Sequence, residues 1–180
     1  MEIREFAEGI LFGDTIEQKL VKPAAIMTDE NPCFIRALPT MPHRPSALKF
    51  ANAAGKLPFP KENAMRDERV RGQVLHFFAN HELLALEVMA LALLKFADAP
   101  PKFRLGLVHT MAEEQQHLVM YMQRMQELGV GFGDVAVNDF FWACLAGMKS
   151  PLDYVAGMSL TFEQANLDFS NHYRRQTMIV

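Results

Sequence analysis

One segment constrains the fold of this chain more than any other. It runs for about thirty residues without a proline, RVRGQVLHFFANHELLALEVMALALLKFAD, and two prolines follow shortly after it. Between Phe77 and Leu94 its only polar side chains are those of Asn80, His81, Glu82 and Glu87. A helix that is apolar nearly all the way round is buried by other helices. The rest of the chain must therefore supply the helices that cover it.

Two further long helices are predicted downstream. One begins at Pro101 and ends at Gly129, a residue typical of a helix C-terminus. The other begins with Ser150 as N-cap and Pro151 at the first helical position, and we expect it to run to about Arg175. A shorter helix is predicted within NDFFWACLAGM. No strand-like alternation competes with this pattern, so we predict an all-α bundle over residues 66–180.

The first 65 residues differ in character from the bundle. Seven of the ten prolines lie between Pro23 and Pro60, and no sustained hydrophobic period crosses this region. Short helices precede it, one of them with Asp14 as N-cap and Glu17 in a capping box. We therefore predict that residues 1–65 form short helices and a proline-rich arm, which packs with the bundle as one unit.

Composition narrows the functional classes. The chain has 180 residues, half of them hydrophobic, and a net charge of −3 without a long basic run, which favours neither nucleic acid nor an anionic membrane as partner. The two cysteines, Cys33 and Cys144, are far apart and indicate a reduced compartment rather than a disulfide scaffold. The first residues carry acids and lack the apolar core of a signal peptide. We expect a soluble cytoplasmic protein.

Two acids in the apolar segment require an explanation. Glu82 and Glu87 lie about 140° apart around a helix, at 100° per residue, so they cannot share one solvent-exposed face. A buried lone carboxylate is costly unless it is paired, protonated or bound to a metal. At least one of the two glutamates therefore needs a partner.

The next helix offers such a partner. If the two helices form an antiparallel hairpin centred on Asp98, then Glu82, 16 residues before the centre, and Glu114, 16 residues after it, reach the same height. His117 projects from the same face as Glu114 because the two are three residues apart. A Glu that faces Glu-x-x-His is half of a dimetal carboxylate site. Glu163, on the third long helix, reaches a similar height whichever way that helix runs, so the predicted ligands are Glu82, Glu114, His117 and Glu163.

Several of these residues have simpler interpretations. Glu-x-x-His alone is common on solvent-exposed helices, so the metal hypothesis depends on the matching heights of Glu82 and Glu163. Glu87 either supports a ligand histidine from the second shell, the interpretation we prefer, or pairs with an arginine. His76 and His81 are expected to satisfy local hydrogen bonds rather than to bind metal.

The stretches HELLALEVMALALLKF and EEQQHLVMYMQRMQELG resemble the first two helices of bacterioferritin-type bundles in the ferritin-like superfamily. FFANHELLALEVMALALL, GDVAVNDFFW and SLTFEQANLDF resemble an uncharacterised bacterial ferritin-like family, over essentially the whole chain. The resemblance implies that Glu82 is the first-helix ligand, Glu114 bridges two metals, and His117 and Glu163 complete the set. The superfamily's fourth helix adds another Glu-x-x-His, which this sequence lacks; Asn166 stands where a histidine would follow Glu163.

Taken with this resemblance, a complete site would hold two iron or manganese ions, and this chain two, one or none. The implied function is O₂ chemistry of the oxidoreductase or hydroxylase type on a small substrate, provided that a fourth helix completes the site. Truncation, a helix supplied by another chain and a degenerate site all stay open. The alternative function is that of a helical bundle without metal chemistry, acting in binding or assembly. An open bundle face would favour a homo-oligomer.

Overall fold

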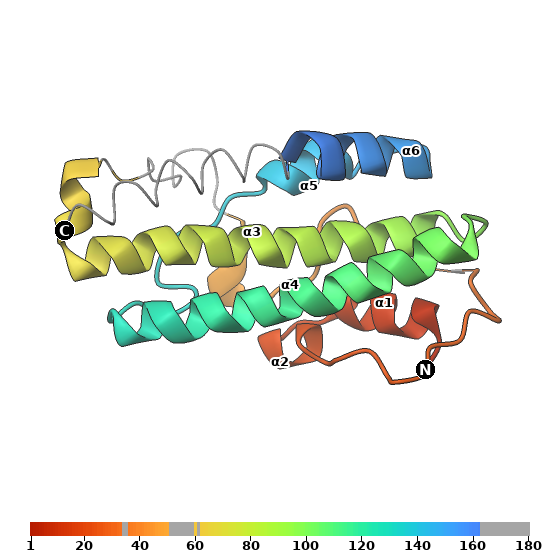
Figure 1. Ribbon diagram of the computed structural model, residues 1–180, viewed down its shortest axis with the longest axis horizontal. Coiled ribbons are helices and arrows are strands. Elements are labelled where there is room, and N and C mark those ends of the chain that lie inside the picture. Colours follow the sequence, from red (N-terminus) through yellow and green to blue (C-terminus); the bar gives the residue numbers. More distant parts are fainter. Residues whose placement is uncertain (34–35, 51–59, 61, 163–180) are drawn as a thin grey trace.

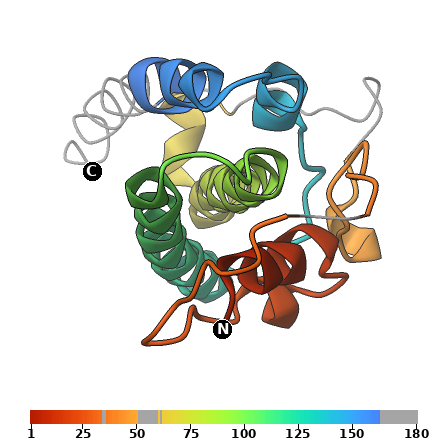
Figure 2. The same cartoon turned by 90° about the vertical axis from the view of Figure 1, so that its right-hand side faces the viewer.

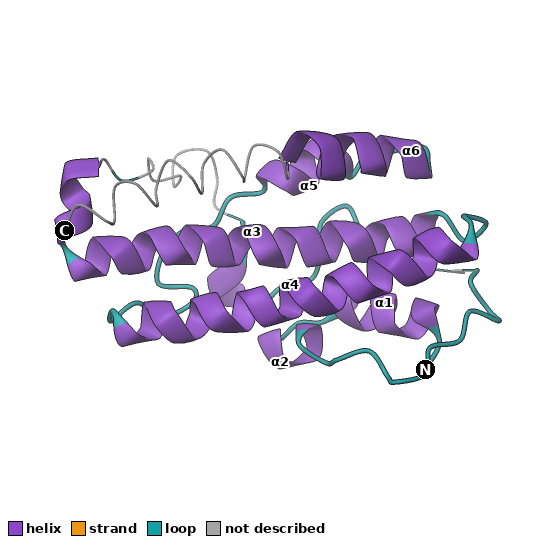
Figure 3. Ribbon diagram, in the orientation of Figure 1, coloured by secondary structure: helices purple, strands orange, loops and turns teal. Residues whose placement is uncertain are grey.

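The computed structural model describes residues 1–33, 36–50, 60 and 62–162, and the described part is a bundle of helices (Figure 1). Coloured by secondary structure, it shows helices joined by loops (Figure 3). Its elements are α1 (Ile3–Phe12), α2 (Ile16–Lys19), the 3₁₀ turns η1 (Ser46–Leu48) and η3 (Glu62–Arg66), α3 (Glu68–Lys95), α4 (Pro101–Glu127), α5 (Phe140–Leu145), α6 (Pro151–Tyr154) and the π-helical segment η4 (Val155–Phe162). The predicted all-α class is confirmed.

Helix α3 is the core of the molecule. Asp67 caps its start by accepting hydrogen bonds from the backbone N–H groups of Arg69 and Val70. Every residue from Leu83 to Leu94 is buried. By length and composition α3 could cross a membrane, but 78% of its most apolar 18-residue window is buried inside the protein, as in the core helix of a soluble protein.

Helix α4 returns antiparallel to α3 and makes the most extensive contact with it (Figure 1). It ends at Glu127, and Gly129 follows with a φ of +73°, a conformation that favours glycine. The N–H of Gly129 donates to Gln126 O at 3.0 Å and that of Val130 to Met125 O at 3.0 Å, which is the Schellman pattern. The predicted end of this helix at Gly129 is thus confirmed.

Two shorter helices, α1 and α5, pack against α3 from two sides. Viewed along the bundle, α1 lies on one side of α3, and α5 and α6 lie on the other (Figure 2). On α1 the residues Ala7, Ile10 and Leu11 are at most 1% exposed. On α5 the indole of Trp142 is buried, and its Nε1 donates to Thr40 O at 2.8 Å. Together with α4, these helices and the N-terminal segment bury the apolar surface of α3.

The third predicted long helix begins as expected and then changes character. The Ser150 side chain accepts from Asp153 N, and Pro151 occupies the first turn, as predicted. After α6 the chain continues as the π-helical η4 up to Phe162, and the predicted continuation to Arg175 lies outside the described residues. Gly157 permits close packing here, because a Cβ at this position would collide with the Leu145 side chain.

The arm is attached to the bundle by backbone and charged contacts. Thr28 pairs with the chain start, donating to Met1 O at 3.0 Å and accepting from Ile3 N at 2.8 Å. Arg104 of α4 holds Asp29 with two hydrogen bonds of 2.6 and 2.8 Å. The same guanidinium donates to the carbonyls of Leu93 and Phe96 at the end of α3, at 2.7 and 2.9 Å. One buried arginine therefore joins the arm, α3 and α4.

The predicted cap of α2 was wrong by one residue. Thr15, not Asp14, is the N-cap, and its hydroxyl accepts from Gln18 N. Gln18, not Glu17, closes the capping box, with its Oε1 accepting from Thr15 N at 3.1 Å and from Asp14 N at 2.7 Å. A Thr–Gln pair bonds to backbone groups in the way that the predicted Asp–Glu pair would. The predicted capping box is therefore present, but it is formed by other residues.

Candidate metal centre

Three of the four predicted ligands come together between α3 and α4. Glu82 lies at the middle of α3, and Glu114 and His117 lie opposite it on α4. His117 Nδ1 is 3.0 Å from Glu114 Oε2 and 4.0 Å from Glu82 Oε2. One donor atom from each residue can be chosen so that all three lie within 4.8 Å of one another. The hairpin therefore brings together the residues that its symmetry predicted.

The cluster is half enclosed and acidic. The two carboxylate side chains are each 19% exposed, whereas His117 is 50% exposed and faces the outside. Among the described residues no lysine or arginine forms an ion pair with Glu82 or Glu114. Burial, a hydrogen bond with Glu114 and the charge of Glu114 raise the pKa of Glu82 to about 10. Without a cation, the two carboxyl groups therefore share a proton at neutral pH.

Tyr121 belongs to the surroundings of this cluster. Burial and, after it, the charges of Glu82 and Glu114 raise the pKa of its phenol. Its ring stacks on that of Phe78, with centroids 5.9 Å apart. Sequence reasoning missed this residue, although its position four residues after His117 places it on the same face of α4.

The donor set fits a divalent transition metal. Two carboxylates and one imidazole nitrogen are ligands that iron(II) and manganese(II) accept, and their convergence leaves further positions for other ligands. A bound cation would also replace the proton that Glu82 and Glu114 share, which removes the cost of placing two acids side by side. Glu163, the fourth predicted ligand, lies outside the described residues.

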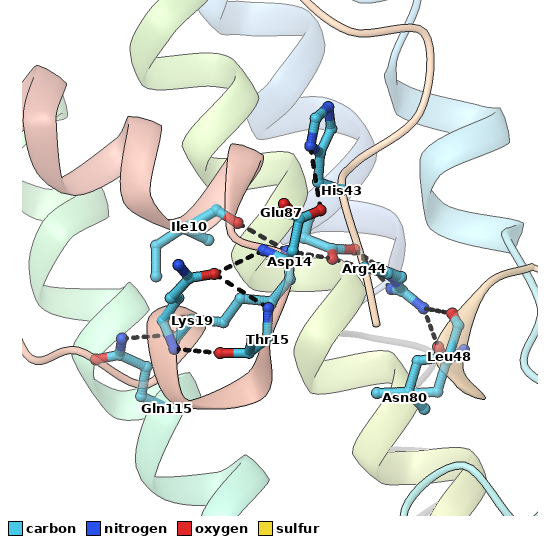
Figure 4. Close-up of polar contacts among 11 residues, drawn as sticks. Ile10, Asp14, Thr15, Lys19, His43, Arg44, Leu48, Asn80, Glu87 and Gln115 are labelled. Carbon is cyan, nitrogen blue, oxygen red and sulfur yellow. Dashed lines mark hydrogen bonds and ion pairs between the residues drawn. The ribbon is translucent and has the colours of Figure 1, made fainter. Parts of the chain in front are cut away.

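Glu87 lies in a different environment from this cluster. Its carboxylate is fully buried and accepts from Arg44, at 2.6 Å from Nη2 and 2.9 Å from Nε, while Lys19 Nζ lies 3.0 Å from it (Figure 4). The contacts of Glu87 are thus with cations of the N-terminal region rather than with a histidine ligand. This is the arginine-paired arrangement that the sequence left open, and it corrects the preferred second-shell interpretation.

The network around Glu87 extends into α1, α3 and the turn η1. Arg44 also donates to Leu48 O at 3.3 Å and to Asn80 Oδ1 at 3.0 Å. Lys19 donates to Ile10 O at 2.7 Å, and burial lowers the pKa of its amine despite the nearby carboxylate. Sequence reasoning missed Lys19 and Arg44, because nothing in their local sequence distinguishes a buried cation from a solvated one.

His76 and His81, the two other histidines of α3, lie in different environments. His76 accepts a hydrogen bond of 2.9 Å from the backbone N–H of Gly133, 57 positions along the chain. His81 has a buried Nδ1 without a hydrogen-bond partner, and its ring packs against Phe77 and Phe141 with centroid distances of 4.2 and 4.8 Å. The expectation of local hydrogen bonds was therefore wrong for both: His76 bonds to a distant segment, and Nδ1 of His81 has no partner.

The fold and the site together define an all-α bundle with a carboxylate–histidine cluster between its two longest helices. A family model described as "Protein of unknown function (DUF455)" matches residues 12–178, and the chain belongs to that family. No curated protein and no solved structure matches the chain at a significant level.

Proposed function

We propose that this protein binds a divalent transition metal between α3 and α4 and is a ferritin-like dimetal carboxylate protein. Glu82, Glu114 and His117 would hold the metal, and Glu163 would be the further ligand. The observation that supports the proposal is the convergence of two carboxylates and an imidazole within 4.8 Å, at a place where no described lysine or arginine pairs with the acids. A cation is the partner that such a cluster lacks.

Bound iron would supply O₂ chemistry of the oxidoreductase or hydroxylase type, acting on a small molecule. The protein's own residues prepare the site for it. Glu114 bonds to Glu82 and lies 3.0 Å from His117, and its carboxylate would be the ligand that two ions share, as the resemblance to ferritin-like bundles implies. Loading requires Glu82 to give up its proton and His117 to present an unprotonated Nδ1. Because His117 is half exposed, the site opens to the outside on the histidine side.

The cysteines are consistent with a reducing compartment. Cys33 and Cys144 are both free and exposed. Exposed thiols persist where glutathione and thioredoxin keep them reduced, and the same conditions keep iron in its ferrous state. We therefore place the protein in the cytoplasm as part of this proposal.

The test is a metal titration of the full chain under anaerobic conditions. Iron(II) and manganese(II) are added to chelator-treated protein, and the bound metal is measured by calorimetry and elemental analysis. We expect one to two ions per chain. We also expect roughly 100-fold weaker binding in Glu114→Gln, since even the outer partners of ligands contribute 10- to 100-fold. The matched control is Glu113→Gln, which alters the adjacent exposed acid and should bind like the wild type.

A second candidate function follows from the shared proton. A protonated Glu82 bonded to Glu114 satisfies both acids without metal, so the cluster could serve only to hold α3 and α4 together in a binding or assembly protein. That protein would bind no added metal, which would refute the metal proposal, and its melting temperature would fall in Glu114→Ala because the contact between α3 and α4 is lost. Stoichiometric metal without O₂ consumption in the presence of a reductant would support metal binding but not oxidase chemistry.

A further inference from the structure

His76 is a buried imidazole that the proposed metal site does not use. It lies on α3, six residues before Glu82, and is 1% exposed. Its Nε2 accepts a hydrogen bond of 2.9 Å from the backbone N–H of Gly133. The ring of Phe132 meets it edge to face, with centroids 5.2 Å apart. The imidazole thus contacts two consecutive residues of the connection between α4 and α5.

This hydrogen bond requires the neutral imidazole. A backbone N–H can only donate, so Nε2 must carry a lone pair and the proton of the neutral ring must be on Nδ1. A protonated ring would present N–H to N–H at this contact, and the bond would be lost.

The surroundings of His76 favour the neutral form. Burial lowers the pKa of its imidazole, and the negative charge of Asp134, in the same connection, opposes burial more weakly. The end of α4 presents Leu128 and Val130 to α3 at this corner, and η1 presents Ala47 to Gly133, all of them uncharged. Asp134 is therefore the charged group that acts on His76 among the described residues.

The loop held by His76 has few other bonds to α3. Gly131 and Asp134 bond to each other, with Gly131 N at 2.7 Å from Asp134 Oδ2 and Asp134 N at 3.1 Å from Gly131 O. These contacts define the shape of the turn but do not connect it to α3. Asn80 holds the far end of the connection through Asn138 O at 3.0 Å. Gly133, in the middle, has a φ of +113° and bonds to His76.

We propose that His76 is an acid-sensitive latch for the loop of residues 131–136. The neutral imidazole holds the loop against α3, and the protonated imidazole releases it. The loop leads into α5, and Phe141 of α5 packs on His81. Release of the loop therefore weakens the packing of α5 against α3 next to Glu82. The latch depends on the Gly133 contact alone and not on metal binding.

Amide hydrogen exchange in the full ¹⁵N-labelled chain tests the latch. The protection factor of the Gly133 amide is compared at pH 7.5 and at pH 4, where a histidine with a lowered pKa is also protonated, with the Leu86 amide as an internal reference in the core. We expect the Gly133 protection to fall about tenfold or more on acidification, the factor that one lost buried hydrogen bond gives, while the Leu86 protection changes little. His76→Gln keeps a carbonyl acceptor that does not titrate, so it should remove the pH dependence. His109→Gln, at an exposed histidine of α4, should leave it intact.

Two results would overturn the proposal. One is a Gly133 protection factor that is equal at both pH values, or that still depends on pH in His76→Gln. The other is a wild-type ¹⁵N spectrum at pH 7.5 in which His76 carries its proton on Nε2 or is doubly protonated. The second measurement needs no variant, so it decides the matter even if His76→Gln does not fold.

Discussion

The buried network around Glu87 yields a stability prediction with a clear magnitude. Glu87→Gln keeps the size of the side chain but removes the negative charge that faces Lys19 and Arg44, both of which are buried. The substitution replaces one of the two carboxylate oxygens with an NH₂ group. This group is a hydrogen-bond donor, and it then faces a cation. Removing one partner of a buried ion pair costs about 3–5 kcal/mol, a large part of the stability of a small domain.

Urea unfolding followed by far-ultraviolet circular dichroism measures this cost. We expect a lower midpoint with an unchanged m-value for Glu87→Gln, and no shift beyond about 0.5 kcal/mol for the exposed control Glu113→Gln. Lys19→Met, which removes one of the two stranded cations, should cost less in the Glu87→Gln background than in the wild type. Additive effects of the two substitutions would show that Lys19 and Glu87 are not coupled.

The same variant should have a distinctive pH dependence. Burial already lowers the pKa of Lys19 below its ordinary 10.5, and loss of the Glu87 carboxylate removes the two largest of the three interactions that raise this pKa. The folded state then releases the Lys19 proton at a pH at which the unfolded chain still holds it. Stability therefore increases as the pH rises toward the unfolded pKa and is lost as the pH falls. The deficit of Glu87→Gln should be smaller at pH 9 than at pH 7, and an equal deficit would refute the reasoning.

Two further predictions concern the metal cluster and the core. The pKa of Glu82 is raised to about 10, so its contribution to the stability of metal-free protein is full below pH 4.5 and is lost as the pH rises toward 10. Glu82→Gln, which cannot ionise, should flatten the fall in urea midpoint between pH 5 and pH 9, by up to about 1.4 kcal/mol per pH unit, and parallel curves would contradict this. In the core, Leu86→Ala removes a fully buried side chain and should cost about 2–5 kcal/mol, whereas Leu152→Ala, 72% exposed, should change the thermal midpoint little.

Much of the bundle could be predicted because the apolar residues of a helix recur with the period of the helix. The apolar circumference of α3 and the equal spacing of Glu82 and Glu114 about the turn follow from the sequence and the geometry of a hairpin. His117 follows from its three-residue offset. These are local or symmetric relations, and they needed no knowledge of other segments.

The partners of Glu87 could not be predicted in the same way. That a buried acid needs a partner follows from solvation energy, and pairing with an arginine was one of the two interpretations. The choice of Lys19 and Arg44 depends on how an irregular, proline-rich region crosses the bundle. No hydrophobic period sets that path. The unsuspected hydrogen bond between Gly133 and His76 has the same origin, because loops carry no repeating signal.

The attachment of the N-terminal region by distant partners has a consequence for the order of folding. Arg44 bonds to a residue 43 positions later, Asp29 to one 75 positions later, and the Lys19 carbonyl to the Gln115 side chain, 96 positions later. Contacts at such separations form only after the intervening chain has been made, and closing these long loops is slow. On the ribosome the first fifty residues emerge first, yet their buried charges find partners only when α3 and α4 have followed. The segment that is synthesised earliest is therefore among the last to acquire its native contacts.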